Sequence, residues 1–334
     1  MNTDHRLAHR SRKLVALGAL MVAIAASATL SVAASTSAAQ RAKTVRIAYL
    51  SFAVANSYDA PMLAAAKAAA KGGGKITVFD AANDPKKQFA QLQTTSSSGQ
   101  YDAIIVQPIF GTGLITEVKN AIKKRIKVVN LDQIMGPDLS TDRTQVPGLS
   151  GNVVQVPTDI GIKLGQLVIS ACTQKKLNPC KVGYLYDIKA SSLDVAIRKG
   201  YNKSLAGHSS IKQLAEGESF FTPAKGLAAV QTMLQAHPDI NLIVGSDQGI
   251  EGAVQVVGKK VVLVGYGGSV AAQQGISAGR WFGSVWQVPA TEGRLAAECA
   301  VKAVQTGKAC GAVHLPLKIV TKANVKNFKG EWPG

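Results

Sequence analysis

The sequence is short of the side chains from which most catalytic and metal centres are built. It contains five histidines, four cysteines and 5% aromatic residues, with 20 acidic residues against 38 Lys and Arg. His208, His237 and His314 lie at predicted helix ends or in a late connection, with no acid paired to them. Neither a P-loop nor a complete G-x-G-x-x-G occurs, because Gly265-Tyr266-Gly267-Gly268 lacks the third glycine at the required spacing. These absences disfavour nucleotide-dependent chemistry and predict no resident cofactor or metal.

One hydrolase-like motif is present, Gly275-Ile276-Ser277-Ala278-Gly279, which fits G-x-S-x-G. A nucleophile elbow requires a strand before the serine and a helix after it. Here the serine follows a predicted helix and precedes a predicted strand within 282–287, which is the reverse order. We therefore interpret the motif as a turn, and an exported hydrolase is a disfavoured alternative.

Basic residues outnumber acidic ones, and the formal net charge is +18 at pH 7. A nucleic-acid partner is one explanation of such a surplus. However, Lys and Arg are scattered singly or in pairs, and the densest run, Lys123-Lys124-Arg125, ends a predicted helix, where the helix dipole favours cations. No aromatic residues are interleaved with them to stack on bases. We expect no nucleic-acid partner, and attraction to an anionic envelope surface explains the charge better.

The N-terminal segment has the pattern of an export signal. It opens with the basic residues Arg6, Arg10, Arg12 and Lys13. An apolar, Ala-rich run over 14–32 and the small-residue cleavage site Ser37-Ala38-Ala39 follow. We expect residues 1–39 to be removed near Ala39, leaving a periplasmic or cell-envelope protein. A retained membrane anchor is the alternative, because the run reaches the ~18 residues of a spanning helix. No cysteine lies near this cleavage site, so a lipoprotein anchor is not expected.

The four cysteines of an exported chain predict disulfides. Cys172 lies near a predicted helix end, and Cys180 lies just before the next strand. Cys299 lies in a helix, and Cys310 lies in the connection that follows it. We expect the bridges Cys172–Cys180 and Cys299–Cys310, because each pair spans the same kind of turn. A zinc site would need closer C-x-x-C pairs or helping histidines.

The stretch Thr44–Lys71 sets the organisation of the rest. Val45–Leu50 predicts a buried strand, 51–58 is a polar and aromatic loop, and a helix runs from about Pro61 to Lys71. Ligands of open α/β sheets sit beyond the carboxyl ends of the strands, so this loop is a candidate binding loop.

Strands and helices alternate along the rest of the chain in two sets, and a chain of this length suits two domains. The further predicted strands are 75–79, 103–107, 127–131, 181–186, 211–215, 242–244, 260–264 and 284–287. The further predicted helices are 85–98, 113–124, 159–172, 193–206, 223–236, 249–257, 270–277 and 291–305. The fold class is therefore α/β, with two doubly wound parallel sheets and a crossover near Pro147–Gly151.

Several predicted strands end in polar residues. These ends are Ser51, Gln107, Asp132-Gln133, Ser246-Asp247-Gln248 and Gln287, with Phe52, Tyr58, Phe220 and Phe221 nearby. Carboxylates and amides can bind hydroxyls in pairs, while aromatic rings cover apolar C–H surface. The alternative for Asp132 or Asp247 is helix capping, which is the commoner role of such a residue taken singly. Their coincidence across strand ends favours a small polar ligand.

Over its length after the leader the chain resembles the type I periplasmic binding proteins of the ribose-binding kind, the solute receptors of ABC importers. The segments that carry the resemblance are Ile47–Ser51 with Asn56-Ser57-Tyr58, Asp80–Pro85, Gln107-Pro108, Val128–Asp132, Gly200-Tyr201, Lys225-Gly226-Leu227, Ala236–Asp239, Ser246-Asp247 with Gly252-Ala253, Val264–Gly267, and Gln287 with Pro289. Their order and spacing together are specific, although each is weak alone.

The resemblance implies a set of ligand contacts. These are Ser51, Asn56, Tyr58, Gln107, Asp132, Gln133, Phe221, Ser246 and Gln287. Phe52 and Asp247 join them as neighbours of the strand ends. Asp194 is a further candidate that could pair with a cationic or hydroxyl-rich group, or cap the helix after Ser191-Ser192.

The chain departs from the family's ribose binders at several of these positions. Gln133 stands where the ribose binders usually have Arg, and Asp194-Val195 stands where they have a second Arg. Gly267 stands where an Asp is expected, and Ser246 stands where they have an Asn. These changes alter the charge and hydrogen bonding of the cleft. The substrate class is therefore open between another sugar, a polyol and a different small polar solute, and ribose is not expected.

The resemblance also implies an architecture and a mechanism. Residues 44–151 plus 288–316 would form an N-terminal lobe, and 152–287 plus 317–334 a C-terminal lobe, joined by a three-stranded hinge. The solute would close the lobes, and an ABC permease would recognise the closed, monomeric receptor. A sensor component that presents solute to a chemoreceptor or sensor kinase is the alternative function.

Overall fold

The computed structural model describes residues 44–334, and Ala42–Gly334 forms one compact unit. The predicted signal peptide lies outside the described residues. Every helix predicted after it is present, with ends that shift by a few residues at most. Among the helices of residues 44–334, none is long and apolar enough to cross a membrane.

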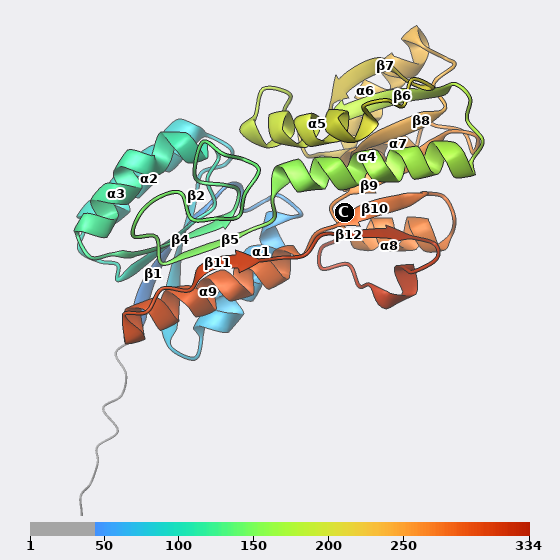
Figure 1. Cartoon of the computed structure of the whole chain (residues 1–334). Helices are drawn as coiled ribbons and strands as arrows, with labels where there is room; N and C mark the ends of the chain where they lie inside the picture. Colours follow the sequence, from blue (N-terminus) through green and yellow to red (C-terminus); the bar gives the residue numbers. More distant parts are fainter. Residues whose placement is uncertain (1–43) are drawn as a thin grey trace, which may run out of the picture. The chain divides into compact units, whose positions relative to one another are not determined.

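The first sheet holds six strands in the order β11-β5-β4-β3-β1-β2, all parallel (Figure 1). The strands are β1 (Val45–Ser51), β2 (Gly74–Asp80), β3 (Ala103–Val106), β4 (Lys127–Asp132), β5 (Gly151–Val154) and β11 (Gly311–His314). The helices that accompany it are α1 (Asp59–Ala70), α2 (Pro85–Ser97), α3 (Gly111–Lys123) and α9 (Pro289–Thr306).

The second sheet holds six strands in the order β12-β10-β9-β8-β6-β7, with β12 antiparallel to β10. The strands are β6 (Cys180–Tyr186), β7 (Ile211–Glu218), β8 (Leu242–Ser246), β9 (Val262–Tyr266), β10 (Gly283–Trp286) and β12 (Lys318–Thr321). The helices are α4 (Pro157–Gln174), α5 (Ser192–Leu205), α6 (Pro223–Ala236), α7 (Asp247–Val254) and α8 (Val270–Ser277), followed by the short η1 (Val325–Asn327). The prediction of two doubly wound α/β lobes is thus confirmed.

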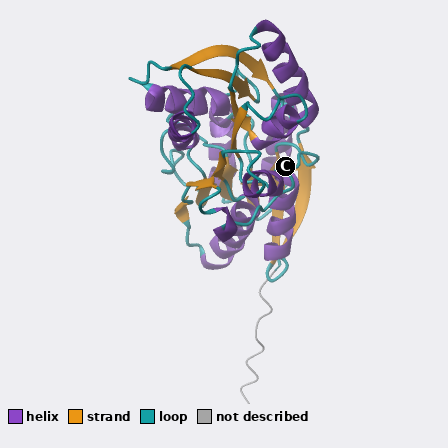
Figure 2. Ribbon diagram, turned by 90° about the vertical axis from the view of Figure 1, so that its right-hand side faces the viewer, coloured by secondary structure: helices purple, strands orange, loops and turns teal. Residues whose placement is uncertain are grey.

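Each sheet is buried on both faces, with helices on either side of the strands (Figure 2). In β1, Ile47 and Tyr49 point into a core formed with α1 and α9. Ala48 and Leu50 point the other way, into a core formed with α2 and α3. Successive side chains of a strand face opposite ways, so a strand covered on both faces is apolar throughout. This is why the predicted strands appear as continuous apolar runs.

The short strands β5, β11 and β12 were not predicted. They contain four residues each and lie at or near the sheet edges, where little hydrophobic pattern is required. Because β5 pairs with β4, the first sheet continues to Val154, past the expected boundary at 151. The chain then passes between the sheets after β5, between β10 and α9, and between β11 and β12.

Both predicted disulfides are present. Cys172–Cys180 joins the end of α4 to the start of β6, with Cα atoms 5.7 Å apart. Cys299–Cys310 joins α9 to the start of the β11 segment, with Cα atoms 5.9 Å apart. Closing such short loops stabilises each lobe by about 2–3 kcal/mol through the entropy of the unfolded chain.

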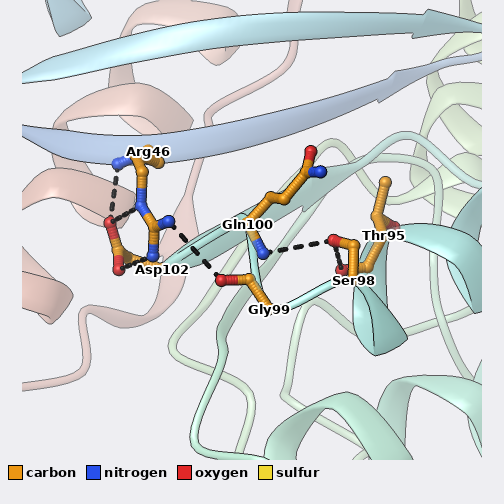
Figure 3. Close-up of polar contacts among 6 residues, drawn as sticks. All are labelled: Arg46, Thr95, Ser98, Gly99, Gln100 and Asp102. Atoms are coloured by element: carbon orange, nitrogen blue, oxygen red, sulfur yellow. Dashed lines mark hydrogen bonds and ion pairs between the residues drawn. The ribbon is translucent and has the colours of Figure 1, made fainter.

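A polar cluster fixes the opposite end of the first sheet. The Arg46 guanidinium donates through Nε and Nη2 to the two carboxylate oxygens of Asp102, at 3.0 and 2.8 Å (Figure 3). The Arg46 backbone N–H also donates to Asp102, and Nη1 reaches the Gly99 carbonyl. The Gln100 N–H donates to Ser98 Oγ in the same turn. This cluster sets the start of β1 against β3, so the strand ends on the far side are held in register.

Candidate functional site

A cavity with about 620 Å³ of empty space, part of it open to solvent, lies beyond the carboxyl ends of strands from both sheets. Its lining follows β1, β3 and β4 in the first sheet and β6, β8, β9 and β10 in the second. This is the position at which open α/β sheets bind ligands.

Most of the candidate residues line this cavity. They are Phe52, Asn56, Tyr58, Gln107, Asp132, Gln133, Phe221, Ser246 and Gln287. The structure therefore brings together residues separated by more than half of the chain. Ser246 combines both roles considered for it, because its hydroxyl accepts from the Gly249 N–H as a helix cap and also lies in the lining.

Three candidates lie outside the lining, and a contact between any of them and a solute stays a prediction. Ser51 is fully buried at the end of β1. Asp194 accepts from the N–H groups of Asp187 and Ile188 at 3.0 and 2.9 Å, so it organises the loop before α5. Asp247 accepts from the Ser269 N–H and the Ser284 hydroxyl, so it joins neighbouring strand ends. Both aspartates have their acceptor oxygens used by the protein itself, but neither is the helix cap that was the alternative, because Ser191 caps α5 and Ser246 caps α7.

Gln107 organises the acidic side of the cavity. Its Nε2 donates to Asp59 Oδ1 at 2.7 Å and to Asp132 Oδ2 at 3.1 Å. Its Oε1 accepts from the Phe52 N–H at 3.2 Å. These bonds fix the orientation of the amide and hold the two carboxyl groups side by side. Among the hydrogen bonds of residues 44–334, none is donated to the other oxygen of Asp132, Oδ1.

The backbone at Asp132 is left-handed, with φ of +65°. This conformation costs most residues free energy, and Asp and Asn tolerate it best among residues with a side chain. The strand β4 ends at this residue, so the left-handed turn directs the chain away from the sheet just where the carboxylate enters the lining. Strain of this kind is often found where a side chain serves a ligand.

The second sheet contributes a different acidic group, Asp187, directly after β6. The hydroxyls of Ser219 and Ser246 donate to its Oδ1 at 2.5 and 2.6 Å, and the Tyr266 hydroxyl donates to Oδ2 at 2.5 Å. Burial raises the pKa of Asp187, and these three donors oppose that rise. The carboxylate is thus an acceptor whose capacity is largely taken by the protein.

Aromatic rings enclose the cavity from both lobes. Phe52 of the first lobe meets Phe221 of the second edge to face, with centroids 6.1 Å apart. Tyr58 meets Trp332 in the same way at 5.3 Å. Nearby, the Gln248 amide of α7 donates to Ser57 Oγ at 3.3 Å. The two lobes therefore touch around the cavity, and the rings present faces and edges suited to covering C–H groups.

The tail after η1 brings Trp332 into the site. Its indole Nε1 donates to the Gly267 carbonyl at 2.8 Å, and its own carbonyl accepts from the Val270 N–H at the start of α8. The preceding Glu331 accepts from the N–H and the hydroxyl of Thr291 in α9. A segment of the tail thus links the first turns of α8 and α9, which belong to different lobes.

Several buried polar atoms around the cavity have no hydrogen-bond partner among the described residues. Gln155 lines the cavity, is 2% exposed, and leaves both Oε1 and Nε2 unpartnered. The Tyr58 hydroxyl, also in the lining, is unpartnered as well. Buried polar groups are nearly always hydrogen-bonded. These atoms can therefore bond to a polar solute, or to water molecules that the solute displaces. Among residues 44–334, no cluster of His, Cys, Asp or Glu is arranged to hold a metal ion.

Raising the pH from the mildly acidic to the mildly basic range should lower the free energy of unfolding of the ligand-free protein. Burial raises the pKa of Asp59 to about 8 and that of Asp132 to about 6. An acid with a raised pKa holds a proton in the folded state that the unfolded chain has already released. Stability is therefore lost as the pH rises from the ordinary aspartate range, near 4, through about 8. Denaturant titrations at a series of pH values measure this slope.

The matched variant for this prediction is Asp59→Asn, which removes the titrating group and should flatten the slope. Glu292, buried in the first turn of α9, has its pKa raised well above its usual range by burial and contributes in the same direction, so part of the slope should remain. A slope that is unchanged in Asp59→Asn, or a stability that rises with pH over this range, would contradict the assignment.

Sequence reasoning missed several lining residues. Asp59 falls between the predicted loop at 51–58 and the helix expected from about Pro61, whereas α1 begins at Asp59 itself. Asp187 follows a predicted strand directly, so the strand-end rule applied to that strand would have found it. Gln155 follows β5, which was not predicted, and Trp332 lies in the tail, where no pattern indicates a site.

Comparison with known proteins agrees with this geometry. A family described as periplasmic binding protein domain matches residues 47–309. The ribose import binding protein RbsB of Bacillus subtilis is 25% identical over 260 residues, which cover 77% of this chain and 80% of the relative. The D-allose-binding periplasmic protein of Escherichia coli is 27% identical over 225 residues, covering 65% and 70%.

Solved structures share the fold. A Caulobacter myo-inositol binding protein aligns with a TM-score of 0.75 at 21% identity, covering 85% of this chain and 95% of that one. An ABC transporter solute binding protein from Mycobacterium smegmatis aligns with a TM-score of 0.74 at 22% identity, covering 87% and 99%. With a family match over most of the described chain and the same two-lobed fold, this chain belongs to the periplasmic binding protein domain family, whose members are substrate-binding proteins and not enzymes.

Proposed function

We propose that the protein is an exported solute-binding receptor that captures a small, hydroxyl-bearing, sugar-like ligand between its lobes and delivers it to an ABC importer. The observation that carries this proposal is the composition of the cavity between the two sets of strand ends. Carboxyl and amide groups from Asp132, Gln107 and Gln155 meet there with aromatic rings, which is the combination that binds hydroxyls and covers C–H surface.

The names of similar proteins support the same class of ligand. They include import receptors for ribose and allose, and a receptor bound to myo-inositol. The three passages of the chain between the sheets would act as the hinge, and the solute would stabilise the closed arrangement by contacting both lobes at once. A membrane permease would then recognise the closed receptor. The predicted leader at 1–39 supports export to the envelope.

A thermal-shift screen followed by calorimetry tests the proposal. The protein without residues 1–39 would be mixed with pentoses, hexoses, inositols and linear polyols, with amino acids and nucleosides as comparison sets. A ligand present at about 100 times its Kd stabilises the folded state by about 2.7 kcal/mol. We expect a clear rise in melting temperature within the hydroxylated set, and a smaller radius of gyration by X-ray scattering with the same compound. A shift confined to amino acids or nucleosides would refute the proposed ligand class.

A further inference from the structure

We propose that the solute bears a protonated amino group, and that an amine-bearing sugar or cyclitol binds in preference to its neutral counterpart. This inference rests on the proposed function, because it names the chemical class that the same cavity takes. It follows from the carboxyl groups of the lining, from the polar atoms left unpartnered there, and from the apolar side chains that share the lining.

The charges of the lining have one sign. The chain as a whole carries 38 Lys and Arg and a net charge of +18. Yet the lining contains the carboxyl groups of Asp59, Asp132 and Asp187 and no Lys, Arg or His. Burial raises the pKa of Asp59 to about 8 and that of Asp132 to about 6, so Asp132 is the more readily ionised of these two near neutral pH. The chain as a whole is rich in basic residues. Its overall composition therefore does not explain why the carboxyl groups of this cavity have no basic residue beside them in the lining.

An uncompensated set of carboxyl groups is poorly matched to a neutral solute. When lobes close around a ligand, water leaves, and a buried carboxylate without a counter-charge becomes costly. A hydroxyl can donate a hydrogen bond to a carboxylate but brings no charge. An ammonium group brings both a donor and a positive charge, so the buried carboxylate gains the counter-charge that a hydroxyl cannot supply. A solute with an anionic group would add to the repulsion.

The acceptor available to the amine is Asp132. Asp187 already receives three hydroxyl donors, and Asp59 receives the Gln107 amide and the Ala53 N–H. Asp132 receives Gln107 on Oδ2 alone, so Oδ1 is left to accept from the solute. The left-handed backbone at the end of β4 carries this carboxylate into the lining.

A second, independent observation indicates where the rest of the solute lies. Gln155 is 2% exposed and lines the cavity with both amide atoms unpartnered, so it can accept from one hydroxyl and donate to another. Ile160, Leu193 and Ile197 add apolar side chains to the same lining. The combination fits a compact ring that carries an ammonium, hydroxyls and exposed C–H groups.

Matched pairs of sugars test the inference. Glucose and galactose would be compared by calorimetry with glucosamine and galactosamine near neutral pH, and myo-inositol with an aminodeoxyinositol. N-acetylglucosamine and N-acetylgalactosamine form a third arm, in which the same nitrogen is present but carries no charge. We expect at least one amine to bind about tenfold or more tightly than its neutral parent, and acetylation to remove that gain.

The outcomes separate this inference from the proposed function. If the neutral sugar of each pair binds as well as or better than the amine, the inference is overturned and the receptor role stands. If acetylation leaves the tighter binding unchanged, charge is not the cause and the inference is again overturned. If no hydroxylated compound binds, with or without an amine, the proposed function falls and the inference falls with it.

Discussion

Replacing Asp132 with asparagine should weaken binding of the solute by roughly 10- to 150-fold. The estimate follows from the loss of a hydrogen bond to a charged acceptor, which is worth about 1.5–3 kcal/mol. Asparagine is the informative replacement because it accepts the left-handed backbone at this position, with φ of +65°, and can still receive the Gln107 amide. The variant should therefore fold normally, and calorimetry with the best ligand from the screen measures the loss.

Asp239→Asn is the matched control for this experiment. It makes the same chemical change at an exposed aspartate that pairs with Lys181 and lies outside the cavity lining. We expect its affinity to equal that of the unaltered protein. Equal affinity in Asp132→Asn and Asp239→Asn would show that the Asp132 carboxylate does not contact the solute, and the site would have to be reassigned.

Replacing Trp332 with alanine should lower the free energy of unfolding by about 3–5 kcal/mol. The side chain is among the largest fully buried ones, packs edge to face on Tyr58, and donates to the Gly267 carbonyl. Its removal leaves a cavity next to the binding site and loosens the tail that joins α8 to α9. We therefore expect weaker solute binding as well, measured at a temperature where the variant remains folded.

Two further variants separate the structural role of Trp332 from its role in the site. Trp281→Ala removes a buried tryptophan from the core of the second lobe, outside the cavity lining. It should lose similar stability but keep its affinity for the solute. Trp332→Phe keeps a smaller ring but loses the indole donor and part of the buried volume, so its stability and affinity should fall between those of the unaltered protein and Trp332→Ala. If Trp332→Ala binds as tightly as Trp281→Ala, the tail is a structural element alone.

Much of the fold could be predicted from the sequence because its main elements are strongly patterned. The apolar run of β1 and the Pro and Asp that open α2 are local signals, and Asp84 indeed caps α2 by accepting from Lys86 and Lys87. The short strands β5, β11 and β12 lack such signals, since their place in the sheets depends on neighbours far away in the sequence. Their conformation is decided by pairing and not by local preference.

The site was predictable to the extent that topology alone determines it. Strand ends of parallel sheets gather at one edge, so Gln107, Asp132, Ser246 and Gln287 could be assigned without coordinates. Whether a given polar residue faces the cavity or the backbone is decided by side-chain geometry. Asp247 accepts hydrogen bonds from Ser269 and Ser284 instead of facing the cavity. No sequence pattern distinguishes it in this respect from Ser246 beside it. The contribution of Trp332 depends on how the tail packs, which the local sequence does not determine.

The contact between Trp332 and Gly267 has a consequence for the evolution of specificity in this lineage. Gly267 has φ of +138°, and a Cβ atom built there would lie 2.6 Å from the indole. A side chain at 267 would therefore collide with the tryptophan, whereas position 332 can change while glycine is kept at 267. In an alignment of close relatives, a residue other than glycine at 267 should therefore occur only where position 332 holds a residue smaller than tryptophan.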